Sequence, residues 1–209
     1  TTQSIGSIVT RIPAAADLFK ARGIDFCCGG HRPLSEALQE QNLDAADVGS
    51  RLDELAAAAQ ASAGRTDFTA MTPAELTGHI EIRHHAYLNE NLPLLGEILG
   101  VVLKAHGRNH PELFRLYGLY GQLRTDLEQH LIKEEELLFP LLNNGLAADP
   151  EAVRLADEIK NEHEAAGQLL KAMRKLSSEY TVPDDACPTY ARLYKGLIEL
   201  ESDIFQHIH

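Results

Sequence analysis

Four histidines are spaced along the chain so that they can meet in one layer of a helical bundle. They are His85, His130, His163 and His207, and Glu134 follows the second of them by one helical turn. The midpoint of each successive pair falls in or beside a cluster of helix-breaking residues, at 106–111, 143–150 and 182–185. If each cluster is a turn between antiparallel helices, all four histidines lie at one depth of the bundle. That arrangement predicts a metal site.

The chemistry of the set favours a metal over a structural role. A lone histidine is more often a core or boundary residue bonded to a carbonyl, or a solvated one. Four buried imidazoles and a buried carboxylate would be costly without mutual neutralisation, and a cation satisfies them all at once. Imidazole and carboxylate ligands without a nearby thiolate suit iron, manganese or zinc. His130 and Glu134 share one helical face, so both can reach the same metal pair.

Four amphipathic helices must position these side chains. The first begins well, with Thr72 as N-cap, Pro73 at the first helical position and Glu75 three residues after the cap. In each helix, core positions recur at alternating steps of three and four, which is typical of a seam that faces a bundle interior. The expected seams are Glu81, His85, Leu88, Leu92, Leu95, Leu99 and Val102; Leu116, Tyr120, Leu123, Leu127, His130, Glu134, Leu137 and Leu141; Ala152, Ala156, Ile159, His163, Ala166, Leu170 and Met173; and Leu193, Leu197, Leu200, Ile204 and His207. The pattern predicts an all-α protein with an antiparallel up-down-up-down four-helix bundle.

The other histidines are expected to stay outside the ligand set. His84 should point about 100° away from its neighbour on an α-helix. The remaining five lie out of phase with a seam, in a turn, in the amino-terminal region or past the last seam histidine: His79, His106, His110, His31 and His209.

The sequence divides into three parts. Residues 1–62 read as a small helical domain, with helices expected over 12–19, 33–41 and 45–59. Residues 63–71, which begin with small and polar residues, are the expected linker, and residues 72–209 are the expected bundle. The chain has no initiator Met and stops inside its last expected helix, so we expect the natural chain to continue beyond the bundle's present end.

The composition of the chain excludes some classes of binding partner and indicates its location. A net charge of −12 over 209 residues argues against nucleic acid or an anionic membrane as partner, since either would need a basic patch. The most apolar stretch, 92–103, contains Glu97 and is too short to span a bilayer, and no signal-peptide pattern opens the chain. Three cysteines, two of them adjacent, do not make a disulfide framework, so a cytoplasmic location is expected.

Cys27 and Cys28 stand in a turn before two glycines. Adjacent cysteines make a strained disulfide and a poor chelate, which disfavours a tetrahedral zinc site. One interpretation is a structural turn with one thiol buried. The other is an accessible thiol pair that can bind a metal ion or be oxidised. Cys187, before the last expected helix, is interpreted as incidental.

The motifs together resemble a known family. His85, the segment 130–140, the segment 162–167 and His207 resemble the hemerythrin-like metal-binding domain. The segment Asp25-Phe26-Cys27-Cys28-Gly29-Gly30 resembles the amino-terminal domain that accompanies it in the Repair of Iron Centres family. The resemblance covers nearly the whole chain. It implies a bundle that holds two non-haem iron ions per chain, bridged by oxo or hydroxo and carboxylate groups, with His85, His130, Glu134, His163 and His207 as ligands.

One departure from the family pattern concerns a second bridging carboxylate. The family has it four residues after the last histidine, which here would be position 211, beyond the end of the sequence. Its absence leaves open whether the site loads fully with iron. Asp126, one turn before His130, and Glu162, beside His163, are either groups that support the ligands and handle protons or ordinary exposed carboxylates.

The resemblance implies repair of iron-sulfur clusters damaged by oxidative or nitrosative stress, with this protein as iron donor and damaged iron-sulfur proteins as clients. Cys27 and Cys28 could guide the transfer. The alternative is a hemerythrin-like protein that binds, scavenges or reduces nitric oxide, or binds oxygen. A ferroxidase or iron store is disfavoured because such sites use more carboxylates. The sequence leaves open whether turnover is enzymatic and whether the protein is a monomer or a homodimer.

Overall fold

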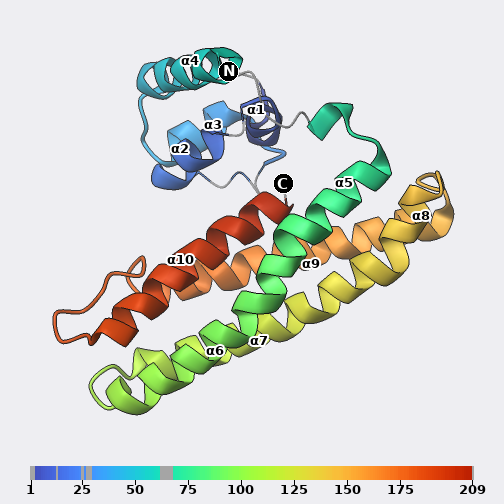
Figure 1. Cartoon of the computed structure of the whole chain (residues 1–209). Coiled ribbons are helices and arrows are strands. Elements are labelled where there is room, and N and C mark those ends of the chain that lie inside the picture. Colours follow the sequence, from blue (N-terminus) through green and yellow to red (C-terminus); the bar gives the residue numbers. More distant parts are fainter. Residues whose placement is uncertain (1–2, 13, 25, 27–29, 62–67, 209) are drawn as a thin grey trace. The chain divides into compact units, whose positions relative to one another are not determined.

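The computed structural model describes residues 3–12, 14–24, 26, 30–61 and 68–208 (Figure 1). Over these ranges the chain consists of helices and turns, with one isolated bridge between Ser4 and Pro33, so the all-α prediction is confirmed. The chain divides into two compact units, Thr1–Thr69 together with the last two residues, and Ala70–His207. Within the described residues, no helix is both long and apolar enough to cross a membrane.

The described residues of the amino-terminal unit form four α-helices around a small apolar core. They are α1 (Ile5–Arg11), α2 (Ala15–Ala21), α3 (Leu34–Glu40) and α4 (Ala45–Ala61). The expected helix over 12–19 is displaced, because Ile12 has a non-helical backbone and ends α1, and α2 begins only at Ala15. Helix α1 is not among the expected helices; Ser4 caps it through its side chain, and it buries Ile5 and Ile8 on one face.

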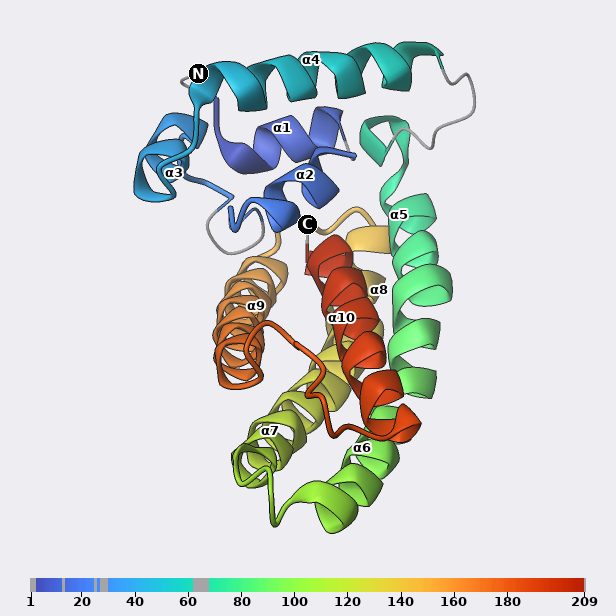
Figure 2. The same ribbon diagram turned by 90° about the vertical axis from the view of Figure 1, so that its left-hand side faces the viewer.

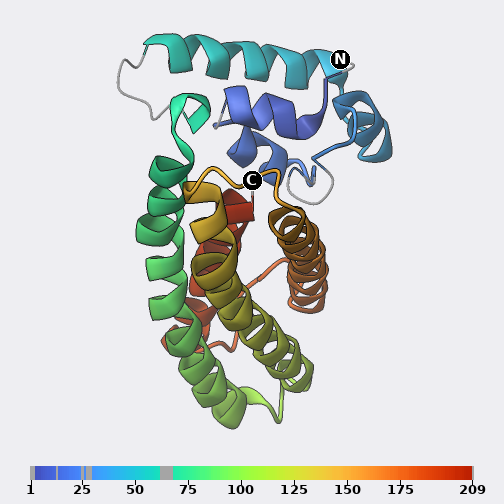
Figure 3. The same cartoon turned by 90° about the vertical axis from the view of Figure 1, so that its right-hand side faces the viewer.

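The second unit is the expected antiparallel four-helix bundle (Figures 2 and 3). Each of its first two long helices contains one π-helical segment, labelled η2 or η3. A short 3-10 helix, η1 (Phe68–Ala70), precedes the bundle. The first long helix consists of α5 (Pro73–Ile80), η2 (Glu81–His85) and α6 (Ala86–His106), and the second of α7 (Glu112–Lys133), η3 (Glu134–Leu138) and α8 (Phe139–Asn143). The third is α9 (Pro150–Leu176) and the fourth is α10 (Pro188–Ile208).

Local sequence sets the ends of these helices. Thr72 accepts a hydrogen bond from the N–H of Glu75, whose carboxylate accepts one from the N–H of Thr72, which confirms the predicted capping box. After α9 the chain makes an unusual turn in which three consecutive residues, 178–180, have positive φ. The Ser177 hydroxyl accepts the N–H of Tyr180, and the Tyr180 ring is buried, so both stabilise a turn that is costly for non-glycine residues.

The seams form the bundle core. Leu88, Leu92, Leu99, Leu123 and Leu197 are at most 1% exposed, as their spacing predicts. α10 approaches α6 closely at Gly196, where a Cβ atom would lie 2.5 Å from Leu95 Cδ2.

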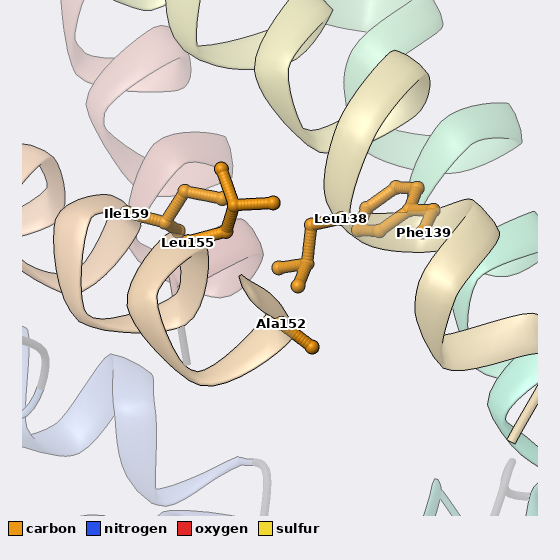
Figure 4. Close-up of a cluster of buried hydrophobic side chains, with 5 residues drawn as sticks. All are labelled: Leu138, Phe139, Ala152, Leu155 and Ile159. Carbon is orange, nitrogen blue, oxygen red and sulfur yellow. The ribbon is translucent and has the colours of Figure 1, made fainter. Parts of the chain in front are cut away.

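A second apolar cluster joins the η3–α8 segment to α9, beside the histidine layer. Figure 4 shows its five buried side chains, of which Leu138 and Phe139 come from η3 and α8 and the other three from α9: Ala152, Leu155 and Ile159.

The two π-helical segments change the phase of the helices that contain them. A π-helical turn takes more residues than an α-helical turn, so a seam counted through it goes out of register. Two expected seam residues are wrong for this reason: Glu81 is exposed and Leu137 is 51% exposed, whereas Leu138 and Phe139 are buried. For the same reason His84, expected to point away from the seam, is buried beside its neighbour. A third expected seam residue, Ala156 on the uninterrupted helix α9, is also exposed, and Leu155 beside it is buried instead.

Candidate metal centre

All four bundle helices contribute to one cluster of polar side chains in the core. His85 is the last residue of η2 and Glu134 is the first residue of η3. His130 lies on α7, His163 on α9 and His207 on α10. The cluster therefore gathers all five residues that the sequence analysis named as ligands. Four of them are buried, whereas the side chain of His163 is 17% exposed and gives the cluster its contact with solvent.

The Glu134 carboxylate lies between two pairs of histidines. Its Oε2 is 3.0 Å from His85 Nε2 and 3.5 Å from His207 Nε2. Its Oε1 is 3.5 Å from His130 Nε2 and 3.9 Å from His163 Nε2. Each oxygen of one carboxylate thus faces the Nε2 atoms of a different histidine pair.

The imidazole rings also approach one another closely. The Nε2 atoms of His130 and His163 are 3.0 Å apart, and those of His130 and His207 are 3.4 Å apart. One ligand atom from each of His130, Glu134, His163 and His207 lies within 4.8 Å of all the others, which is a spacing suited to a metal ion. A buried set of nitrogen and carboxylate donors at these distances fits a divalent cation such as iron, manganese or zinc.

Carboxylates hold two of the rings from behind. His85 Nδ1–H donates to Glu135 Oε1 at 2.7 Å, and His130 Nδ1–H donates to Glu162 Oε2 at 2.9 Å. Glu162 is itself paired with Lys133. Such bonds fix the tautomer of a histidine so that its Nε2 lone pair faces the ligand side. Phe139 further restricts the His85 ring by stacking on it, with centroids 5.8 Å apart.

The electrostatics keep the cluster ready for a cation. Burial, reinforced by the neighbouring His130, lowers the pKa of His163 to about 4 and that of His207 to about 3. Burial alone would raise the pKa of Glu134, but its hydrogen bond with His85 and the nearby imidazoles hold it below its ordinary value. Burial opposes charge on His85 too, but its bonds to Glu134 and Glu135 outweigh it and raise the pKa of that ring. At neutral pH, His163 and His207 are neutral imidazoles and Glu134 is a carboxylate, the forms that bind metals.

Of the remaining sequence candidates, one lies at the cluster. Glu162 is at the cluster through His130, whereas Asp126 is exposed on α7 and takes no part in the contacts described here. Cys27 and Cys28 lie outside the described residues, as does His209. His31 is exposed in the amino-terminal unit, and the rings of His106 and His110 lie near Tyr190 at the far end of the bundle.

Three residues near the cluster were missed. Glu135 bonds to His85, and His84 Nδ1–H donates to Asp203 Oδ1 at 3.1 Å in a buried pair. Asp203 stands four residues before His207, the same interval that separates His130 from Glu134, so its spacing could have identified it. The sequence carries no comparable signal for His84, because its burial depends on the π-helical turn.

Comparison with known proteins agrees with this architecture. The family model described as the hemerythrin HHE cation binding domain matches residues 77–209, and the ScdA_N model, described as a domain of unknown function, matches residues 1–56.

Curated relatives match over nearly the whole chain. The iron-sulfur cluster repair protein ScdA of Staphylococcus haemolyticus is 34% identical over 98% of this chain and 92% of its own length. The iron-sulfur cluster repair protein YtfE of Pectobacterium atrosepticum is 33% identical over 99% of this chain and 91% of its own length. A probable iron-sulfur cluster repair protein of Haemophilus influenzae is also 33% identical, over 99% and 92%. The chain therefore belongs to the hemerythrin-like family that contains the ScdA and YtfE proteins.

Proposed function

We propose that the protein repairs damaged iron-sulfur clusters by donating iron from a two-iron site in its bundle. The relatives named above are called iron-sulfur cluster repair proteins, which supports the repair part of this proposal. The observation that carries the proposal for this chain is the division of the histidines by Glu134, whose two oxygens face two separate histidine pairs. Such a carboxylate can bridge two cations, each of which has two imidazole ligands.

The residues of the cluster would act either as iron ligands or as groups that orient those ligands. His85 and His207 would hold one iron ion, His130 and His163 the other, and Glu134 would join them. The metal pair supplies a store of labile iron. Glu135 and Glu162 keep the Nε2 atoms of their histidines turned inward, so the empty site does not have to reorganise when iron returns.

A protein that donates iron must be able to release the iron from its site. Imidazole and carboxylate ligands bind protons in competition with metal, so they give up iron more readily than four thiolates do. His163 is the most exposed of the five residues, and its side chain lies on α9 at the solvent side of the cluster. We propose that iron leaves past this residue. Cys27 and Cys28 stay candidates for the next stage of transfer to a client, in the reducing cytoplasm that the cysteine content favours.

The domain arrangement supports this assignment. We propose that residues 72–209 act as the iron-binding domain and residues 1–62 as the domain that presents Cys27 and Cys28, with 63–71 as linker. The matched family ranges, 1–56 and 77–209, leave a similar interval between them.

A second function rests on the small number of ligands. Five side chains do not fill the coordination positions of two iron ions, so positions remain for a small molecule such as nitric oxide or oxygen. Tight reversible gas binding without loss of iron would favour this function over donation.

The first experiment is a metal count on protein purified from iron-replete cells, with zinc and manganese measured in the same run. We expect about two iron ions per chain, and loss of both in Glu134→Gln, because an amide nitrogen would then face one histidine pair. The matched control is Glu136→Gln, an exposed carboxylate two residues away. Unchanged iron in Glu134→Gln would contradict the bridging role.

Iron donation has its own assay. The iron-loaded protein, mixed with a peroxide-damaged iron-sulfur dehydratase, should restore the dehydratase activity while its own iron falls. The metal-free protein should not. Restoration at the same rate with both preparations would refute donation.

A further inference from the structure

The cluster contains two buried polar atoms without a partner, one helical turn apart. Asp203 Oδ2 and His207 Nδ1 are both shielded from solvent, and neither has a hydrogen-bond partner among the described residues. Both lie on α10, four residues apart, and so on the same face of that helix. One is an acceptor and the other is a donor whenever His207 presents its Nε2 lone pair to the cluster.

Two other histidines of the cluster show how a carboxylate can hold a ring through its Nδ1–H. Behind His85 stands Glu135, and behind His130 stands Glu162, each accepting the Nδ1–H while Nε2 faces Glu134 or a neighbouring ring. His207 has the same orientation, with Nε2 3.5 Å from Glu134 Oε2. By analogy we expect a carboxylate near Nδ1 of His207, and the Oδ2 atom of Asp203 is a buried carboxylate oxygen that has no hydrogen-bond partner among the described residues.

Asp203 is itself fixed from the other side. His84 Nδ1–H donates to Asp203 Oδ1 at 3.1 Å, and Arg83 lies 3.7 Å from the same oxygen. The His84 ring is also 6.0 Å from the His207 ring, so both histidines flank one carboxylate. His84 belongs to η2, beside His85, and Asp203 to α10, so the pair connects the elements that carry two of the proposed ligands.

We propose that Asp203 is the positioning residue of His207. Asp203 Oδ2 and His207 Nδ1 do not bond each other directly, so Oδ2 accepts the Nδ1–H of His207 through one bridging water and directs Nε2 of that ring toward Glu134. His84 holds Asp203 in place, and no covalent or redox step is involved. This inference rests on the proposed metal site for its effect on iron, but the effect on the His207 tautomer exists in the metal-free protein as well.

The experiment compares four full-length proteins: wild type, Asp203→Asn, His84→Gln and, as matched control, Glu201→Gln. Glu201 is another buried carboxylate of α10, but it pairs with Arg174 rather than with the histidines. Iron(II) affinity is measured anaerobically against a chelator, and circular dichroism checks that each variant folds. The ¹⁵N resonances of the imidazoles in the metal-free proteins report the tautomer of His207.

We expect Asp203→Asn to weaken iron binding by about 10- to 100-fold, as loss of a carboxylate behind a ligand histidine does elsewhere. His84→Gln should weaken it less, because glutamine keeps a donor, and Glu201→Gln should leave it unchanged. In the metal-free protein, His207 should carry its proton on Nδ1 in the wild type and lose that preference in Asp203→Asn.

Three outcomes would overturn the proposal. They are wild-type affinity in Asp203→Asn, an unchanged His207 tautomer in that variant, and an equal loss of affinity in the Glu201→Gln control. If Asp203→Asn does not fold, the His84→Gln variant provides the test. Wild-type iron affinity together with an unchanged His207 tautomer in His84→Gln would also refute the role of the Asp203–His84 pair. Failure of the wild type to bind iron would instead refute the proposed function and leave the tautomer result as the test of this inference.

Discussion

Acid should unfold the metal-free bundle well before it protonates most of the surface carboxylates. In the folded bundle the pKa of His163 is held at about 4 and that of His207 at about 3 by burial and the neighbouring imidazole of His130. In the unfolded chain both rings titrate near 6.5. As the pH falls below 6.5 the unfolded state therefore binds protons that the folded state excludes, and stability is lost down to the folded pKa values.

The size of the loss follows from the pKa shifts. At pH 4.5 each ring stands about two units below its unfolded pKa, which corresponds to about 2.7 kcal/mol per ring at 1.36 kcal/mol per unit. Together, His163 and His207 account for about 5 kcal/mol. His85 acts in the opposite sense, because its pKa is raised in the folded state, and it reduces this total. Domains are stable by only about 5–15 kcal/mol, so the remaining effect is large.

Tyrosine fluorescence during urea unfolding provides the assay. All six tyrosines lie between residues 87 and 194, so the signal reports the bundle and not the amino-terminal unit. The unfolding free energy of the metal-free protein should fall steeply between pH 7 and pH 4.5, and His207→Gln should remove about half of that dependence. His31→Gln, which changes an exposed histidine of the amino-terminal unit, is the control. Equal stability of the wild type at pH 7 and pH 4.5 would refute the reasoning.

Three further predictions concern packing, a buried hydrogen bond and a thiol. Leu155→Ala should lower the unfolding free energy by about 2–5 kcal/mol, because the buried side chain leaves a cavity. Val153→Ala, at a half-exposed position on the same helix, should change the unfolding free energy by less than about 0.5 kcal/mol. Urea unfolding of both variants measures the difference. Tyr120→Phe removes a 2.7 Å hydrogen bond to the carbonyl of Leu92 and should cost about 0.5–1.5 kcal/mol in the same assay, so an unchanged midpoint would contradict a contribution from that bond. Cys187 has its pKa lowered to about 7 by the backbone N–H of Tyr190 and by His106, so its alkylation by iodoacetamide, followed by peptide mass spectrometry, should be half-maximal near pH 7 and shift to higher pH in His106→Gln.

The sequence predicted the histidine layer because spacing alone determines depth in an antiparallel bundle. Residues equidistant from a turn return to the same level, and the turns were marked by glycine, proline and asparagine clusters. The seam positions from Leu88 to Val102 and from Leu116 to His130 were predictable for a similar reason, since an uninterrupted α-helix keeps its phase. The ligand roles themselves stay predictions until metal is counted.

The contacts behind the ligands could not be predicted in the same way. Glu135 follows Glu134 directly, and on a regular helix it would face about 100° away from it. It reaches His85 because both residues belong to π-helical segments, where the turn is wider. The same widening buries His84. Periodicity counts residues and cannot detect a local change in the number of residues per turn.

The two π-helical segments make the polar cluster sensitive to changes in chain length that the apolar core would tolerate. Each of the first two long helices contains one residue more than continuous α-helical winding would need, and the proposed ligands stand where that residue is accommodated. Deleting one residue within Glu81–His85 would restore regular α-helical winding, and both α5 and α6 would keep their apolar faces toward the bundle, because the phase shift between them disappears with the extra residue. The wide turn that buries His84 beside His85 would be lost, and with it the contact between His84 and Asp203. A single-residue deletion there would therefore spare the fold of the bundle and disturb the cluster.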